Sequence, residues 1–484
     1  MPADTVAPPL NDATRVERRS IEFIPHEERY GTPRRLFTLW FSVNMQITAF
    51  VIGALGVVAG LNIFWALVAI VVGTAIGAIF MAGHSAQGPH LGVPQMIQSR
   101  AQFGVYGAGL PLLVMVLSYS LFTAANAVLM RTPIQQALPL SDNSAIAVFS
   151  VMTLFIAFVG YELIHRLAAW MSIVSLLLFA AAGVLAAFHP FPANAWQPVA
   201  SGLHLKAFMI ALMSSASWAI GYAPLVADYS RYLPADVKTS ATFWYSYWGL
   251  FCGSVFVMVV AAMIAAFSPG IVEDPAGAVA GLFSGEWRWL IYVLIVVGVL
   301  QANVMNVYSA YMSGTTIFTG FKGVSQISRR TKFFVMALAT AGAAAVASAT
   351  QYHFFDYFSD IIFAQLYVTV PWTSINLCDF YLVRRGRYDV AAIYDTEGEY
   401  GKYNAGTMLV FILSLAVQIP FMDLSFYKGP VARYFGTDVT MYVSILFPGL
   451  FYYLVNMKTA ARSRELERRL RPGAARPPRL REGT

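Results

Sequence analysis

Charged residues are scarce in this chain. Asp, Glu, Lys and Arg make up 12% of its 484 residues, whereas 58% are hydrophobic. A soluble globular protein carries about 25% charged residues. Apolar runs of about 20 residues recur along the chain, and each is long enough to cross the ~30 Å hydrocarbon core of a bilayer as a helix. The composition excludes an ordinary soluble protein and predicts an all-α integral membrane protein.

Other absences narrow the function. The two cysteines, Cys252 and Cys378, lie in or beside apolar segments, which excludes a disulfide framework and a CxxC metal motif. The chain has no Ser–His–Asp, HExxH or Walker pattern, and its seven histidines are scattered. The first 35 residues are polar and Arg-rich and show no signal peptide. We expect no enzyme activity, no metal site, no cofactor and no obligate protein partner.

Twelve membrane spans are predicted from the apolar runs. Their approximate ranges are 36–60, 61–82, 104–130, 144–160, 166–190, 205–227, 240–268, 286–314, 332–350, 357–383, 405–422 and 439–459. The remaining ends are an N-terminal tail, residues 1–35, and a basic, Pro-rich tail, residues 460–484, which we expect to be disordered.

The basic residues predict the orientation of these spans. With the N-terminus in the cytoplasm, most of the 32 Lys and Arg residues fall on the cytoplasmic side. The exceptions are Arg131, Lys206, Arg288, Lys428 and Arg433. This asymmetry predicts a multi-pass protein of the plasma (inner) membrane with both termini cytoplasmic. The +7 net charge is therefore a topology signal, not a nucleic-acid-binding patch.

Charges at the span ends are expected to stay solvated. We interpret Asp228 and Arg231 as a solvated charge pair that holds the inner loop, and a gating role is the alternative. Asp379 is also expected to lie in solvent. The inner segment 83–104 carries four Gly and two Pro, too many for a plain helix.

Uncharged polar residues gather in a few spans. "WFSVNMQITAF" places Ser42, Asn44, Gln46 and Thr48 at alternate positions, which cannot share one helical face. Either these side chains point at different neighbours, or the helix is unwound there. In "ASWAIGYAPLVADYSRYLP", Pro224 should break a helix shortly after Trp218.

Two further spans add amides and aromatics. Phe122 and Asn126 are spaced i, i+4 and so share a face, and "QANVMNVYS" carries Gln301, Asn303 and Asn306. A single amide in a membrane helix usually bonds a neighbouring helix, and a Trp usually lies at the interface. Their co-occurrence at mid-depth favours a pocket for a flat heterocycle, since aromatics stack on its faces and amides bind its edge.

Five segments, in order, resemble the purine–cytosine permease branch of the nucleobase–cation symporter family. They are "IEFIPHEERYGTPRRLFTLWFSVN", "GVPQMIQSRAQFG", "WAIGYAPLVADYSRYLP", "NVMNVYS" and "PWTSINLCDFYLVRRGRYD". The resemblance covers about residues 20–390. It implies a LeuT-type fold with inverted repeats at 36–190 and 205–383, two added helices within 405–459, and broken first and sixth spans beside the substrate.

The resemblance also implies functional residues. The third-span aromatic and amide fall on Phe122 and Asn126, the sixth-span aromatic on Trp218 beside the break at Gly221, and an eighth-span pair on Met305 and Asn306. In the first span Asn44, Gln46 or Thr48 would face the ligand. Relatives often have Trp at the position of Phe122 and Pro at that of Met305.

The expected function is import of cytosine or a purine such as adenine or hypoxanthine by alternating access. Gln301 and Ala302 stand where sodium-coupled relatives have two hydroxyl residues, so proton coupling is preferred over sodium. Allantoin, hydantoin, uracil or a thiamine-like heterocycle are alternative substrates. A channel or a receptor without transport is the remaining alternative.

Overall fold

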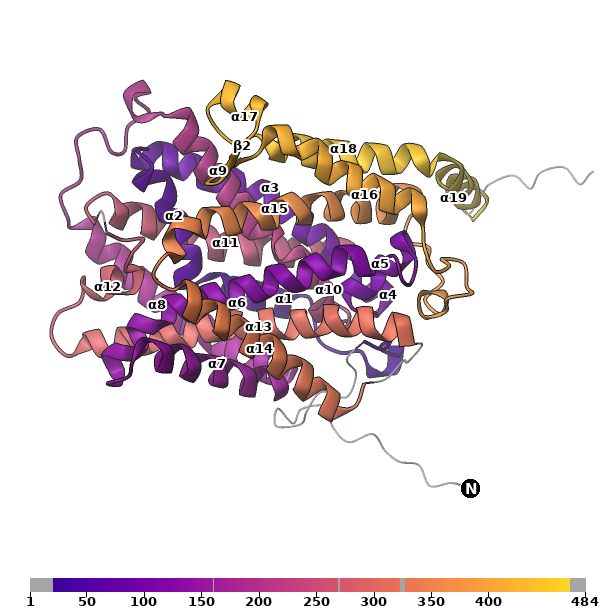
Figure 1. Cartoon of the computed structure of the whole chain (residues 1–484), viewed down its shortest axis with the longest axis horizontal. Helices are drawn as coiled ribbons and strands as arrows, with labels where there is room; N and C mark the ends of the chain where they lie inside the picture. The colour runs from indigo at the N-terminus through magenta and orange to yellow at the C-terminus, as the bar shows by residue number, and fades with distance from the viewer. Residues whose placement is uncertain (1–20, 160, 269, 323–326, 471–484) are drawn as a thin grey trace, which may run out of the picture.

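The computed structural model describes residues 21–159, 161–268, 270–322 and 327–470. It is mostly helical, and most long helices run in the same general direction (Figure 1). The described residues form a single two-stranded antiparallel hairpin, β1 (Asp423–Leu424) and β2 (Tyr427–Lys428).

Helices account for every predicted span of the first half. The elements are η1 (His26–Glu28), α1 (Arg34–Asn44), α2 (Ile47–Val58), α3 (Ile63–Ser85), α4 (Gly88–Leu91), α5 (Gln95–Phe103), α6 (Gly109–Ala137), α7 (Asp142–Val159) and α8 (Tyr161–Ala187). α1 and α2 together occupy the first predicted span.

The second half continues in the same way. Up to the tenth predicted span it contains η2 (Ala200–Gly202), α9 (Leu205–Ile220), η3 (Ala223–Leu225), α10 (Val226–Ser230), α11 (Thr239–Ala265), α12 (Pro275–Ala280), α13 (Trp287–Lys322), α14 (Arg329–Thr350), α15 (Phe354–Cys378) and η4 (Asp379–Val383). After these come η5 (Ala392–Tyr394), α16 (Ala405–Gln418), η6 (Ile419–Phe421), α17 (Pro430–Phe435), α18 (Thr440–Val455) and α19 (Met457–Leu470).

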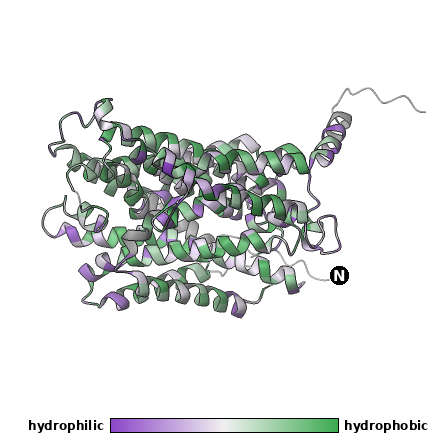
Figure 2. Ribbon diagram, turned by 45° about the horizontal axis from the view of Figure 1, so that its top comes forward, coloured by the Kyte–Doolittle hydropathy of each residue, from purple (hydrophilic) through white to green (hydrophobic). Residues whose placement is uncertain are grey.

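Many of these helices are long and apolar enough to cross a membrane. Among the described residues eight helices meet that condition, and the number rises to 10 if each of two bent helix pairs is one span. Hydrophobic residues run along the helices, whereas hydrophilic ones gather at many of their ends (Figure 2). The chain is therefore built as a multi-pass membrane protein, and the count of twelve crossings stays a prediction.

Two helices are broken near their middle, as the sequence predicts. α1 and α2 meet at 61° across Met45 and Gln46. α9 ends at Ile220, and one short 3-10 turn containing Pro224 separates it from α10. Both breaks leave backbone groups outside regular helix, which a membrane protein tolerates where they are buried or line a cavity.

The helices form two main groups. α1–α2, α3, α9–α10 and α11 pack mainly against one another, and α6, α7, α13 and α14 form the second group. Small residues let the first group pack closely. A Cβ on Gly77 of α3 would lie 2.6 Å from the Ala216 carbonyl oxygen of α9, and one on Gly253 of α11 would lie 2.4 Å from the Phe41 carbonyl oxygen of α1. Such close backbone approach favours helix association in membranes.

The inner segment 83–104 is ordered as two short helices, α4 and α5, and every residue of α5 is buried. Gly88 of α4 packs directly against Ser230 and Arg231. The expectation that Asp228 and Arg231 stay solvated is therefore wrong, since their exposed fractions are 2% and 0%.

Asp379 is also buried, with none of its surface exposed. Its carboxylate accepts hydrogen bonds from Gln102 Nε2 at 2.8 Å, the Tyr388 hydroxyl at 2.6 Å and the Tyr452 hydroxyl at 2.8 Å. Arg384 Nε lies 3.5 Å from the same carboxylate. The expected solvation of Asp379 is wrong because α18 and the segment after η4 cover it.

The C-terminal tail also differs from the expectation of disorder. α19 extends to Leu470 and bends away from α18, the two axes meeting at 72°. Residues 471–484 lie outside the described part of the chain.

Candidate substrate-binding site

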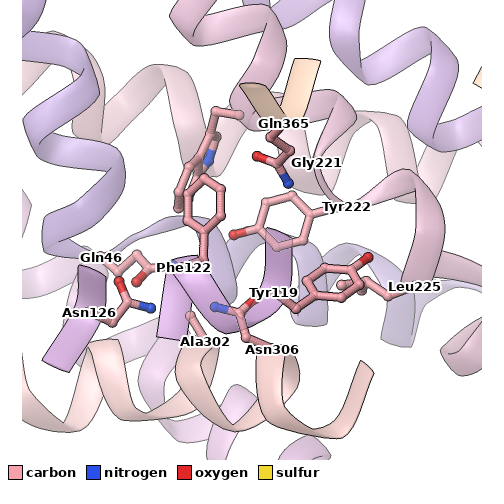
Figure 3. A pocket seen from close by; sticks show the side chains of 11 residues that line it. Gln46, Tyr119, Phe122, Asn126, Gly221, Tyr222, Leu225, Ala302, Asn306 and Gln365 are labelled. Atoms are coloured by element: carbon pink, nitrogen blue, oxygen red, sulfur yellow. The ribbon is translucent and has the colours of Figure 1, made fainter. Parts of the chain in front are cut away.

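A pocket lies between the two helix groups, where both breaks meet. The cavity there is only about 20 Å³, well below the ~300–1,000 Å³ of small-molecule sites, so its lining must move apart to admit a ligand. α6, α9, α13 and α15 contribute side chains to it, as do the two breaks (Figure 3). The lining residues are Gln46, Tyr119, Phe122, Asn126, Trp218, Gly221, Tyr222, Leu225, Ala302, Asn306 and Gln365.

The indole of Trp218 is held in a fixed orientation. Its Nε1 donates a 2.7 Å hydrogen bond to Asn44 Oδ1, which also accepts from Ser254 Oγ at 2.9 Å. Asn44 Nδ2 in turn donates to the Trp40 carbonyl oxygen at 2.6 Å. Asn44 does not line the pocket, but it orients the indole that does.

Aromatic rings dominate the apolar part of the lining. The Tyr222 ring meets Trp218 edge to face, with centroids 5.5 Å apart and an interplanar angle of 87°. Trp40 packs against the other side of Tyr222 at 5.6 Å. Phe122 and Tyr119 come from α6, and Figure 3 shows Phe122 extending into the pocket. The pocket therefore offers the ring surfaces that a flat heterocycle needs.

Two of the lining amides, those of Gln46 and Asn126, are oriented by hydrogen bonds to residues outside the lining. Gln46 Nε2 donates to the Val43 carbonyl oxygen, which the break has freed, at 2.9 Å, and Gln46 Oε1 has no hydrogen-bond partner in the described chain. Asn126 Oδ1 accepts from the Thr48 hydroxyl at 2.7 Å, and its Nδ2 donates to Asn303 Oδ1 at 3.2 Å. One acceptor, Gln46 Oε1, is thus left for a ligand.

Two more amides, those of Asn306 and Gln365, have no hydrogen-bond partner among the described residues. They come from α13 and α15 and lie on opposite sides of the pocket (Figure 3). Gln365 fits because residue 221 is glycine, since a Cβ there would lie 2.6 Å from Gln365 Nε2. Each amide offers both donors and acceptors, so this pair can match a mixed hydrogen-bonding edge.

The structure brings most of the predicted site residues together. Those that line the pocket are Trp218, Phe122, Asn126, Asn306, Gln46 and Gly221. Asn44 and Thr48 lie behind it and orient Trp218 and Asn126. Met305 is buried outside the lining, on the uninterrupted helix α13.

Sequence reasoning did not place Tyr119, Tyr222, Leu225, Ala302 and Gln365 in the site. Tyr119 precedes Phe122 and Asn126 at i, i+3, i+7 spacing, so helical periodicity could have found it. Gln365 carries no local signal, because only the approach of α15 to the break at Gly221 brings it to the pocket.

No group of three or more His, Cys, Asp or Glu side chains in the described ranges could hold a metal ion. Where α13 faces the first break, Gln301 Nε2 donates a 3.1 Å hydrogen bond to Ser42 Oγ. An amide donor therefore joins these two helices at that point.

Comparison with known protein families gives one extended match. A profile described as "Permease for cytosine/purines, uracil, thiamine, allantoin" matches residues 23–444. The Bacillus subtilis (strain 168) protein YxlA, assigned as a purine–cytosine permease, is 40% identical over 442 residues, which cover 91% of this chain and 96% of that protein. The Emericella nidulans purine–cytosine permease fcyB is 24% identical over 456 residues, covering 90% and 87%.

Solved structures support the same architecture. The nucleobase–cation symport-1 transporter Mhp1, closed with bromovinylhydantoin bound, superimposes with a TM-score of 0.72 at 17% identity, over 94% of this chain and 96% of that one. A Na⁺-coupled sialic acid symporter gives a TM-score of 0.55 at 12% identity, covering 90% and 91%. The chain therefore has the LeuT-like fold.

Proposed function

Since the chain belongs to the family of permeases for cytosine and purines, uracil, thiamine and allantoin, we propose that it imports cytosine or a purine such as adenine or hypoxanthine. Transport is secondary active and follows alternating access across the plasma (inner) membrane. The observation that carries this proposal is the pocket at the two helix breaks, where aromatic rings accompany the amides of Asn306 and Gln365, which have no hydrogen-bond partner among the described residues.

In this proposal the base lies between Trp218 and Phe122, which contact its two faces. Asn306 and Gln46 bind its edge, Asn126 adds the N–H of its Nδ2 that does not bond Asn303, and Gln365 supplies a further amide. A nucleobase presents donors and acceptors on one planar rim, which suits amides because each carries both kinds of group. The shell behind the pocket keeps Trp218 and Asn126 oriented, so little ordering is needed on binding.

Alternating access needs two bodies that move relative to each other around the pocket. The two helix groups supply such bodies, and the pocket lies between them. The inverted repeats 36–190 and 205–383 are the proposed source of this arrangement. The basic residues place both termini, and the α4–α5 end of the molecule, in the cytoplasm.

We propose that protons rather than sodium ions drive the transport. A sodium site requires several oxygen ligands. The Ala302 side chain has no ligand atom. Gln301 donates its amide N–H to Ser42 Oγ, and its Oε1 is a single buried oxygen with no hydrogen-bond partner among the described residues. One side-chain amide oxygen at the contact between α1 and α13 falls short of the several oxygen ligands that a sodium ion needs.

Allantoin, hydantoin, uracil and thiamine-like compounds are second candidates, because the same rings and amides suit other flat heterocycles. One observation favours hydantoins among them, namely the bromovinylhydantoin bound in the Mhp1 structure. A channel would instead need a continuous polar pore, and a receptor would bind the base without accumulating it.

The test is radiolabelled cytosine and adenine uptake into proteoliposomes, with a pH gradient or a sodium gradient imposed separately. Accumulation driven by the pH gradient alone is expected. Trp218→Ala and Asn306→Ala should abolish uptake without reducing membrane insertion, whereas Trp248→Ala, at a half-exposed position on α11, serves as the matched control. Full uptake by both pocket variants would refute the site, and a competition panel separates the candidate substrates.

A further inference from the structure

A titratable side chain outside the pocket, His84, is completely buried at the end of α3. Its Nδ1 lies 3.1 Å from Gln95 Nε2 of α5, and its Nε2 has no hydrogen-bond partner within the described ranges. Buried polar atoms are normally paired, and leaving one unpaired costs about 1–3 kcal/mol. The substrate site does not use this imidazole, so its burial calls for another role.

The surroundings of His84 favour the neutral imidazole while the contact is closed. The Trp372 ring of α15 stacks on the imidazole, with centroids 4.8 Å apart and an interplanar angle of 7°. Trp372 is itself held by a 2.9 Å hydrogen bond from its Nε1 to Ser99 Oγ of α5. The imidazole is fully buried, and burial disfavours the charged form of a histidine, so a proton on His84 favours a conformation in which this contact is open.

A carboxylate bonds the backbone of this contact rather than the imidazole itself. Asp228 Oδ1, from α10, accepts a 2.8 Å hydrogen bond from the backbone N–H of Gln95, the residue whose side chain meets His84. Arg231, which directly follows α10, donates through Nε to the Asp228 carbonyl oxygen at 3.3 Å. Leu225, which lines the pocket, precedes Asp228 by three residues, so the cluster adjoins the substrate site.

The other helices around this end of α3 bring few ionisable groups. The Tyr381 hydroxyl of η4 donates to the Gly83 carbonyl oxygen at 2.8 Å. α11 has no charged residue, and it contributes Ser246, which is 2.6 Å from Ser85. Asp379, which directly follows α15, is linked to this region through side-chain amides. Its carboxylate already accepts three hydrogen bonds. His84 is thus the member of the cluster whose ordinary pKa lies nearest neutrality.

Protonation would change the hydrogen bonds that close this contact. Gln95 Nε2 faces His84 Nδ1 and also the Oε1 atoms of Gln87 and Gln98, at 3.4 and 3.3 Å. An imidazolium donates from both nitrogens, so Gln95 must turn its unpartnered Oε1 toward His84. That rotation brings Gln95 Oε1 against Gln87 Oε1, so two acceptors face each other. Gln87 is itself held by a 2.9 Å hydrogen bond from its Nε2 to Asn376 Oδ1 of α15.

The contact joins parts that belong to different helix groups. α3 packs in the group with the broken helix α9–α10. α5 is tied to α13 of the other group, because Arg100 Nη2 donates to the Thr316 carbonyl oxygen at 2.6 Å and to Thr319 Oγ1 at 3.0 Å. Burial lowers the pKa of Arg100 to about 10, so the guanidinium stays charged near neutral pH. If the two helix groups move apart at the end of the molecule that carries α4 and α5 (Figure 1), α3 and α5 must separate.

We propose that His84 is the proton-binding site of the transporter, and that its protonation releases α3 from α5 so that the pocket opens to the cytoplasm. The inference rests on the proposed proton-coupled import. One proton from the external solution binds a ring nitrogen of His84 and leaves to the cytoplasm once the contact has opened. No other bond is formed or broken.

The test compares His84→Gln with His90→Gln in proteoliposomes loaded and assayed with radiolabelled cytosine or adenine. His90 is an exposed histidine of the same inner segment, hydrogen-bonded to Thr239 Oγ1 at 2.8 Å. At one proton per substrate, a gradient of about one pH unit drives roughly tenfold accumulation. His90→Gln should keep that accumulation. His84→Gln should retain counterflow exchange but no longer concentrate the base.

A second variant keeps the proposal testable if His84→Gln does not insert. Gln95→Glu places a carboxylate beside the imidazole, so the pH at half-maximal uptake should move upward. If the wild type accumulates the base and His84→Gln accumulates it equally well, only the role of His84 is refuted. An unchanged pH profile in Gln95→Glu has the same consequence. If the pH gradient does not drive uptake by the wild-type protein, proton coupling itself is refuted, and this inference with it.

Discussion

Asn44 lies behind the pocket, and we expect Asn44→Ala to weaken substrate binding although it removes no atom of the lining. The change deletes the acceptor of the 2.7 Å bond from Trp218 Nε1 and of the 2.9 Å bond from Ser254. Leaving a buried N–H without an acceptor costs about 1–3 kcal/mol. If that cost falls on the bound orientation of the indole, the Kd for the base should rise roughly 5- to 150-fold.

The assay is equilibrium binding of radiolabelled cytosine and adenine to detergent-purified protein, with size-exclusion chromatography to verify folding. Ser254→Ala is the matched control, because it removes a second donor to the same Asn44 oxygen and leaves the Trp218 bond intact. Its Kd should stay close to that of the wild type.

A double-mutant cycle separates orientation of Trp218 from general loosening. Trp218→Phe removes the indole N–H, so adding Asn44→Ala to it should have little further effect. The expected coupling energy is therefore about 0.5–3 kcal/mol. Effects that add within about 0.5 kcal/mol, or a wild-type Kd in folded Asn44→Ala, would refute the assigned role of Asn44.

Three further predictions concern packing, a buried charge and substrate choice. Gly253→Leu should lower the melting temperature strongly in detergent, because its Cβ would lie 2.4 Å from the Phe41 carbonyl oxygen, whereas Gly342→Leu, with nothing within 4 Å, should not. Asp379→Ala should destabilise the fold by about 3–5 kcal/mol, measured by thermal unfolding, since its partners stay buried; unchanged unfolding would contradict this. Gln365→Leu should weaken binding of the preferred base by about 1–3 kcal/mol and change the order of competitors in an uptake panel, and an unchanged order would exclude Gln365 from substrate contact.

The helix breaks and the core of the pocket could be predicted from the sequence because their signals are local. Pro224 interrupts an apolar run, and the alternate polar positions from Ser42 to Thr48 match no single helical face, so the pattern predicts either unwinding or side chains that point at different neighbours. The i, i+4 spacing of Phe122 and Asn126 is enough to predict that they share a helical face. In each case the residues that determine the geometry lie within one or two helical turns of one another.

The remaining features depend on contacts between distant segments. The position of Asp379 at the end of a span predicts solvent exposure. Tyr452, which lies 73 residues later on α18, instead covers its carboxylate and donates a hydrogen bond to it. α5 reads as a polar inner loop, but it is buried beneath helices from both groups. Gln365 reaches the pocket only through the missing Cβ of Gly221. Nothing in the local sequence encodes such approaches.

The close packing around Gly77 and Gly253 has a consequence for how this transporter can be adapted to new substrates. The helices that carry Trp218 and Gln46 belong to a group in which even one added methyl group meets backbone, so substitutions that reshape that wall carry a high risk of misassembly. The facing wall, supplied by α6, α13 and α15, holds Phe122, Asn306 and Gln365 without that constraint. A directed-evolution library for altered specificity should therefore vary the facing wall and leave the glycine-packed group unchanged.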